Sequence, residues 1–146
     1  MLARRELSEA QLRERLARRQ LDPTDIDEAV SRLLEERALD DRRVALACAR
    51  TEVRLRRRGR ARVLRQVQSI GIARDVASAA VAEVFAEIDE PALLEQALER
   101  RLRGGASLAD AATCRRVQRY LLAQGFGAEQ VGRAIAARAR QTRPRL

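Results

Sequence analysis

The chain has 146 residues, enough for one ordinary domain or for a few small helical modules in a row. Its 30 basic residues are all arginine and outnumber the 21 acidic residues, whereas histidine and lysine are absent. This composition excludes imidazole catalysis, Schiff-base chemistry and the lysine of a phosphate-binding loop. Apolar residues make up 46% of the chain and aromatic residues only 2%, so the core must be aliphatic.

The first third of the chain predicts three helices. Residues 1–7 are typical of a short helix or the tail of one, and an S-x-x-Q capping box at Ser8 opens a helix to about residue 20. Asp22-Pro23 marks the start of a second helix, to about residue 37, and Asp40 caps a longer third one. The side chains expected to face the core are Leu12, Leu16, Ile26, Val30, Leu33, Leu34, Val44, Cys48, Val53 and Leu55.

Five more helices are predicted after the break at Gly59. Gly71 suits the left-handed position that ends a helix, Asp89 suits a cap, and Ser107 is expected to open the next helix. The tail after residue 140 is expected to fray. The predicted helices span about 60–70, 74–87, 90–103, 107–124 and 128–140.

The apolar pattern of one helix–turn–helix segment occurs three times. The inward turn residues Leu21, Ile72 and Phe126 are 51 and 54 positions apart, with matching apolar residues on either side. One such unit cannot bury its apolar face alone, so the pattern predicts an all-α fold of stacked helix-turn-helix-like repeats in an elongated array. The expected boundaries are 1–57, 58–104 and 105–146 within one continuous structural unit, and the alternative is a single bundle with coincidental spacing.

Charge is distributed unevenly along the sequence. The segments 1–52, 53–74, 75–110 and 111–146 carry net charges of −1, +8, −5 and +7, which add up to the total of +9. The first basic segment holds seven arginines within twelve positions and no acid to neutralise them. Arg57, Arg58, Arg60 and Arg62 are expected to be exposed. The full set of candidate binding residues is Arg54, Arg56, Arg57, Arg58, Arg60, Arg62 and Arg65.

A guanidinium group binds phosphates and carboxylates equally well, so nucleic acid and an acidic protein groove both remain open as partners of this block. A solvated helix face without any partner is the alternative. Specific base recognition by all three helix-turn-helix segments is disfavoured, because the second helix of the first segment starts with acidic residues.

The remaining signals point away from catalysis. Cys48 and Cys114 lie far apart without a metal-ligand spacing and are expected to be buried, reduced thiols. The adjacent carboxylates Asp40-Asp41 and Asp89-Glu90 lie where helix starts are predicted, and the helix dipole explains them there. We therefore expect no enzyme activity, no cofactor and no metal. The sequence shows no signal peptide and no apolar run long enough to span a membrane, which predicts a soluble, cytoplasmic protein.

Four stretches resemble the RecX family, the regulators of the bacterial recombinase RecA. They are L-A-R-R-E-L-S-E-A-Q-L-R-E-R-L from Leu2, A-L-D-D-R-R-V-A from Ala38, R-R-G-R-A-R-V-L-R-Q-V-Q-S-I-G-I from Arg57 and R-R-V-Q-R-Y-L-L-A-Q-G-F from Arg115. The resemblance implies tandem three-helix repeats in an elongated, curved molecule. It also implies binding to RecA and to the RecA–single-stranded DNA filament. The chain departs from the family in having Val44 where an aromatic residue is common.

The leading hypothesis is therefore a monomeric, non-enzymatic regulator that binds RecA filaments and inhibits recombinase and coprotease activity in DNA repair, homologous recombination and the SOS response. Direct DNA contact is compatible with it. One alternative is a general basic nucleic-acid-binding protein without RecA specificity, and another is a helical scaffold for some acidic protein. The family has no catalytic residues to carry over, so only the arginine block is assigned a role.

Overall fold

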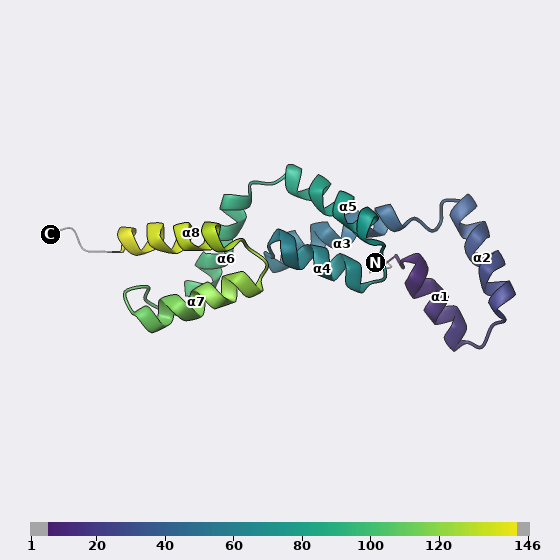
Figure 1. The fold of residues 1–146 in the computed structure, drawn as a ribbon, viewed down its shortest axis with the longest axis horizontal. Helices are drawn as coiled ribbons and strands as arrows, with labels where there is room; N and C mark the ends of the chain where they lie inside the picture. The colour runs from purple at the N-terminus through teal and green to yellow at the C-terminus, as the bar shows by residue number, and fades with distance from the viewer. Residues whose placement is uncertain (1–5, 143–146) are drawn as a thin grey trace. The chain divides into compact units, whose positions relative to one another are not determined.

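The computed structural model describes residues 6–142, and within this range the chain is all-α, with eight helices and no strand (Figure 1). This confirms the predicted fold class. The helices are α1 (Glu9–Arg18), α2 (Pro23–Glu35), α3 (Asp41–Arg56), α4 (Arg60–Ser69), α5 (Arg74–Ala86), α6 (Glu90–Leu102), α7 (Ala111–Ala123) and α8 (Ala128–Gln141).

The chain divides into two compact units. Unit 1 comprises Met1–Arg50 and Leu64–Val84, and unit 2 comprises Thr51–Val63 and Phe85–Leu146. Helices α3, α4 and α5 each contribute residues to both units. No helix in the described range is long and apolar enough to cross a membrane.

Most helix starts follow from short-range capping. The Ser8 hydroxyl accepts a hydrogen bond from the backbone N–H of Gln11 at 3.1 Å, and the Gln11 side chain accepts one from the Ser8 N–H at 3.0 Å. This reciprocal pair satisfies two backbone donors that the helix itself cannot. Asp22, Asp40 and Asp89 likewise accept from N–H groups in the first turns of α2, α3 and α6. The predicted caps at these four positions are confirmed.

Two predicted helix starts are wrong. Glu6 and Leu7 are not helical, and residues 1–5 of the expected opening helix lie outside the described range. Helix α7 begins at Ala111, later than the predicted start at Ser107. Asp110 is the cap, because its carboxylate accepts from the Ala112 N–H at 3.1 Å and from the Thr113 hydroxyl at 3.0 Å. These bonds lower the pKa of Asp110, that from the Ala112 N–H most strongly.

The first core of unit 1 lies between α1 and α2. Ile26, Val30 and Leu39 are buried, and Leu12, Leu16 and Leu33 pack against them. Leu34 was expected to be inward but is 43% exposed. Ile26, Val30 and Leu33 follow the spacing of one helix face, and Leu34 lies about 100° beyond Leu33, at the edge of that face.

Leu55, near the end of α3, was also expected to be inward and is 66% exposed. Val53 of the same helix is only 8% exposed. Two residues two positions apart point about 200° away from each other around a helix, so one buried face cannot hold both. Because Val53 occupies the buried face, Leu55 is exposed between Arg54 and Arg56.

The core of unit 2 is built on α6, α7 and α8, which contact one another. Each helix contributes one aliphatic face, with few aromatic side chains, as the composition requires. The main buried side chains of this core are Leu93, Leu94, Leu98, Leu108, Val117, Leu121, Phe126 and Val131.

A similar joint occurs once in each unit: the start of one helix packs against the glycine turn that joins two others. In unit 1 the Ser8 hydroxyl donates to the carbonyl of Ile70, and a Cβ on Gly71 would collide with Ala10. In unit 2 the Gly59 N–H donates to the Gln124 carbonyl at 2.8 Å. A Cβ on Gly59 would lie 2.6 Å from the Gly125 backbone, so both joints require a bare glycine.

The turn between α1 and α2 takes the same left-handed step without glycine. Gln20 has a φ of 62°, and Leu21 after it is 43% exposed, although an inward side chain was expected there. Its counterparts Ile72 and Phe126 are buried at 4% and 7% exposure. Helix starts cover the turns at Gly71 and Gly125, where the absence of a side chain leaves room for the close approach of Ala10 and Arg62.

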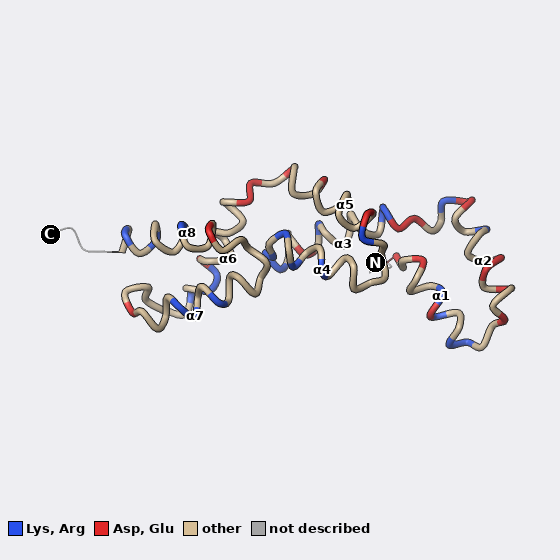
Figure 2. The backbone as a smooth tube through the Cα atoms, in the orientation of Figure 1, with Lys and Arg blue, Asp and Glu red and all other residues tan. Residues whose placement is uncertain are grey.

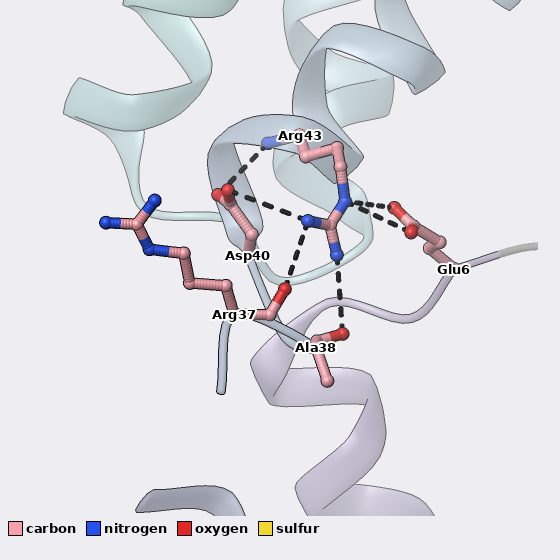
Figure 3. Close-up of polar contacts among 5 residues, drawn as sticks. All are labelled: Glu6, Arg37, Ala38, Asp40 and Arg43. Atoms are coloured by element: carbon pink, nitrogen blue, oxygen red, sulfur yellow. Dashed lines mark hydrogen bonds and ion pairs between the residues drawn. The ribbon is translucent and has the colours of Figure 1, made fainter. Parts of the chain in front are cut away.

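Arg43 ties the segment before α1 to the link between α2 and α3 (Figure 3). Its guanidinium contacts both carboxylate oxygens of Glu6, at 3.0 and 2.8 Å, and donates to the backbone carbonyls of Arg37 and Ala38. The hydrogen bond with Glu6 is the main reason that the pKa of Arg43 is raised. This arginine satisfies two backbone carbonyls of the link that follows α2.

Candidate partner-binding surface

The arginine block spans the end of α3, the link from residue 57 to 59 and the start of α4. Figure 2 shows basic residues gathered where α3 ends and α4 begins, and acidic residues at the link between α5 and α6. Six of the seven candidate arginines belong to unit 2, and Arg65 belongs to unit 1. The fold gives these seven side chains very different surroundings.

Arg58 is not a surface residue. Its side chain is 13% exposed and its Nη1 lies 2.5 Å from Oε2 of Glu52, whose side chain is 4% exposed. The expectation that Arg58 is exposed and has no acid to neutralise it is therefore wrong. Glu52 precedes the block in sequence, and one and a half turns of helix and a left-handed Arg57 bring the two side chains together.

Arg60 and Arg62 also have partners inside unit 2. Arg60 Nη2 lies 2.7 Å from Oε1 of Glu90, and its guanidinium carbon lies 5.2 Å from the centre of the Phe85 ring. Arg62 donates from Nη1 to the carbonyl of Ala123 at 3.2 Å, near the end of α7. We call Arg58, Arg60 and Arg62 the paired arginines, since each holds neighbouring elements of unit 2 together.

Arg54 and Arg56 present their charge outward. Both are exposed, and Arg56 forms one long ion pair, with its Nε 3.8 Å from Oε1 of Glu52. Among the residues that the structure describes, Arg54 has no ion-pair or hydrogen-bond partner for its guanidinium. We call these two the open arginines. Arg65, in unit 1, is likewise exposed and without such a partner within the described range.

Arg57 lies between these two groups. It adopts a left-handed conformation with a φ of 53° and donates from Nη1 to the side-chain oxygen of Gln96 in α6. This bond to a neutral amide fixes the guanidinium while leaving its charge unneutralised. The sequence predicted the charge of this residue but carried no signal of its contact with α6.

A groove that the sequence did not predict lies between the end of α3 and α6. Its volume is about 560 Å³. On the α6 side, Gln96, Glu99, Arg100 and Arg103 follow the spacing i, i+3, i+4, i+7 of one helix face, and Glu95 flanks them. That spacing was readable in the sequence, but two glutamates and two arginines leave this side without net charge, and the positive charge of the groove comes from Arg54 and Arg57 opposite it. The lining residues are Arg54, Leu55, Arg57, Glu95, Gln96, Glu99, Arg100 and Arg103.

The C-terminal basic segment is partly neutralised in the same way. Arg138 of α8 contacts both Glu95, at 3.9 Å, and Glu99. Arg133 pairs with Glu129 one turn before it. In α7, Arg115 and Arg119 are exposed and form no ion pair with an acid of the described range. Figure 2 shows basic positions along α7.

The two thiols are consistent with a packing role. Cys48 and Cys114 are half-buried and are not joined by a disulfide, so the expectation of full burial is only partly met. The Cys114 Sγ lies 2.9 Å from the Leu108 carbonyl, just before the Asp110 cap.

Together these observations define an all-helical, arginine-rich protein in which some basic side chains brace the fold and others face outward. Comparison with known proteins identifies its family. Residues 1–33 match the family model described as RecX, first three-helix domain. The chain is 34% identical over 137 residues to the regulatory protein RecX of Halorhodospira halophila, covering 94% of this chain and 83% of that protein. The chain belongs to the RecX family of regulatory proteins.

Other relatives agree with this assignment. The regulatory protein RecX of Pelodictyon phaeoclathratiforme is 23% identical over 135 residues, covering 92% of this chain and 82% of that protein. The crystal structure of RecX from Lactobacillus salivarius superposes with a TM-score of 0.79 at 15% identity, covering 96% of this chain and 90% of that one. A second crystal structure of a regulatory protein RecX gives a TM-score of 0.75 at 19% identity, with 92% and 65% coverage. The two structures support the fold.

Proposed function

We propose that this protein regulates the recombinase RecA by binding to RecA and to RecA–single-stranded DNA filaments, and that it inhibits recombinase and coprotease activity. Through these activities it would act in DNA repair, homologous recombination and the SOS response. The observation that carries the proposal is the presence of outward-facing arginines in a chain of the RecX family. Under this proposal it works as a monomer in the cytoplasm and without catalysis of its own.

Within the predicted binding set, we assign the direct contact to the open arginines Arg54 and Arg56, together with Arg57 and Arg65. A guanidinium fork forms two parallel hydrogen bonds with a carboxylate or a phosphate, so these residues suit RecA side chains and filament DNA alike. Arg58, Arg60 and Arg62 contribute indirectly, because their contacts with Glu52, Glu90 and Ala123 hold the end of α3 and the start of α4 in place.

We further propose that the chain consists of three repeats, at 1–57, 58–104 and 105–146. The joint that recurs in each unit supports this division. Each joint places the start of one repeat's first helix against the turn within the next repeat, at Gly71 and at Gly125. Recurrence of the same contact at matching positions is what nearest-neighbour packing of repeats predicts.

RecA assembled on single-stranded DNA provides the test. Adding the protein is expected to lower the rates of ATP hydrolysis and strand exchange in proportion to its concentration. The variant Arg54→Glu/Arg56→Glu should lose at least tenfold in potency, because reversed charges repel the carboxylates or phosphates that the arginines bind. Adding Arg65→Glu should weaken it further. No effect of the wild-type protein at several-fold excess over RecA would refute the proposal.

A matched control uses arginines of the same exposure away from unit 2. Arg15 and Arg19 are exposed in and just after α1, and Arg15→Glu/Arg19→Glu removes the same charge. We expect this variant to inhibit RecA as the wild type does. An equal loss in both variants would mean that total charge, and not the open arginines, determines the effect.

General nucleic-acid binding is the alternative that the net charge of +9 favours. It predicts undiminished binding to DNA when RecA is absent. On duplex DNA the logarithm of the affinity should then fall with the logarithm of salt concentration, with a slope of about −0.9 for each neutralised phosphate. Tight binding to bare DNA with no added affinity for RecA filaments would favour this alternative.

A further inference from the structure

The groove between α3 and α6 contains both charge and an exposed apolar side chain. Four arginines line it, and Leu55 at its edge is 66% exposed, more than any other large apolar side chain in the described range. Covering this leucine with an aliphatic side chain of a partner would remove apolar surface from water, which is favourable. The groove therefore offers an apolar anchor surrounded by cationic groups.

Hydrogen bonds within the fold fix the side chains of two of these arginines. Arg57 donates to Gln96, and Arg100 donates from Nη1 to the Leu55 carbonyl at 3.3 Å. Both bonds are to neutral groups, so they restrict the side chains without neutralising them. Because these side chains are already held, they lose less conformational freedom when a ligand binds than flexible side chains would.

The other two arginines, Arg54 and Arg103, are exposed and have no ion-pair partner among the described residues. The acids in the groove, Glu95 and Glu99, both contact Arg138 from α8. Their negative charge is thereby partly satisfied from outside the groove, and the lining keeps a net positive charge.

We propose that this groove is a docking site for an acidic peptide segment that carries one aliphatic side chain. The aliphatic side chain would cover Leu55, and flanking carboxylates would bind Arg54, Arg57, Arg100 and Arg103. Single-stranded nucleic acid fits less well, because its binding sites usually combine basic residues with aromatic stacking platforms and none of the lining residues is aromatic. The proposal shares Arg54 and Arg57 with the proposed RecA contact but does not require the partner to be RecA.

The test uses a fluorescein-labelled synthetic peptide of about ten residues, made of aspartate and glutamate around one central leucine, with fluorescence anisotropy as the readout. The full-length protein is expected to bind this peptide. Arg54→Ala/Arg103→Ala should weaken binding about tenfold or more, because it removes two charge-assisted contacts. The control Arg115→Ala/Arg119→Ala removes the same charge from the exposed side of α7 and should change the affinity less than twofold.

The apolar contact is tested by a double-mutant cycle. Replacing the peptide's leucine by serine should weaken binding to the wild type about threefold or more, and Leu55→Ala should weaken binding of the leucine peptide similarly. The two changes together should cost little more than either alone, since both remove the same contact. Strictly additive losses would contradict the placement of the leucine on Leu55.

Three results would overturn the proposal. One is a peptide affinity too weak to detect, and another is an equal loss in the control variant. The third is an oligothymidylate of about twelve nucleotides that binds more tightly than the peptide and displaces it, which would make the groove a nucleic-acid site. None of these bears on RecA inhibition, so peptide binding can fail while the inhibition assay succeeds, and the reverse.

Discussion

The paired and the open arginines are neighbours in sequence but have different roles in the fold. Arg58, Arg60 and Arg62 each contact a specific acid, ring or carbonyl in unit 2, whereas Arg54 and Arg56 extend into solvent from the last turns of α3. Charge density along the sequence does not distinguish them. A basic run can therefore be partly a structural element, and its exposed members, of which Arg54 has no acidic partner in the described range, are the ones open to a partner.

The largest expected loss of unfolding free energy comes from breaking the ion pair between Arg58 and Glu52. Arg58→Ala leaves the Glu52 carboxylate, 3% exposed, without its closest partner. Removing one member of a buried ion pair costs about 3–5 kcal/mol of unfolding free energy. Urea denaturation should show this loss, while Arg54→Ala stays within about 0.5 kcal/mol of the wild type. Equal stability of both variants would erase the distinction between paired and open arginines.

A double variant tests whether the loss in Arg58→Ala comes from the carboxylate that is left without its partner. Glu52→Leu/Arg58→Leu replaces the pair by apolar side chains of similar reach, and such replacements are often neutral or stabilising. We expect it to recover most of the stability lost in Arg58→Ala. If it is no more stable than Arg58→Ala, the loss there comes from packing and not from the uncompensated carboxylate.

The next largest loss of stability is expected at the joint beside the paired arginines. Gly125 has a φ of 99°, and a Cβ there would collide with the backbone N–H of Arg62. Gly105 has a similar φ of 82°, but a Cβ there would meet no atom within 4 Å. Gly105→Ala should therefore cost only the conformational strain, about 1 kcal/mol, and Gly125→Ala clearly more, about 3 kcal/mol. Equal shifts in the melting temperature would mean that the close approach at Gly125 is relaxed.

A smaller effect is expected at Arg60. Its contact with Glu90 is half-exposed, and the Phe85 ring adds a cation–π interaction. Interactions of these kinds contribute about 1 kcal/mol together. Arg60→Ala should lower the unfolding free energy by that amount, and the loss should shrink at high salt because the ion pair is screened. Arg65→Ala, without a partner in the described range, serves as the control with no change.

The smallest effect is expected at an exposed carboxylate, for contrast with the buried Glu52. Hydrogen bonds from the Ala112 N–H and the Thr113 hydroxyl lower the pKa of Asp110 in the folded protein. Its contribution to stability is thus full above the unfolded-state pKa of about 3.9 and is lost as the pH falls through the lower folded-state value. Asp110→Ala should reduce the melting temperature at pH 7 and make no difference at a pH below both pKa values. A constant difference across the titration would contradict this linkage.

Much of the fold was predictable from local signals. The caps at Ser8, Asp22, Asp40 and Asp89 and the left-handed glycines depend on residues within a few positions, so the sequence contains the whole cause. The predicted helix start at Ser107 is wrong for a reason that is also local. It is a good cap by type. The carboxylate of Asp110, three positions later, accepts hydrogen bonds from two donors, and the helix begins after Asp110.

The pairing of the arginines could not be predicted in the same way. Arg60 and Glu90 are thirty positions apart, and Arg62 meets a carbonyl at Ala123, so their contacts depend on how α4 packs within unit 2. The groove has the same origin, since Leu55 and Arg103 come from different parts of the chain. The periodicity of α6 indicated a shared face for Gln96, Arg100 and Arg103, but only the fold identifies what that face meets.

The central claim is that the open arginines bind the RecA–single-stranded DNA filament. The most direct measurement is the affinity of the wild type, Arg54→Glu/Arg56→Glu and Arg15→Glu/Arg19→Glu for preassembled filaments, by co-sedimentation at one salt concentration. We expect the first variant to bind at least tenfold more weakly than the wild type and the second to bind as the wild type does. Undiminished binding of Arg54→Glu/Arg56→Glu would contradict it.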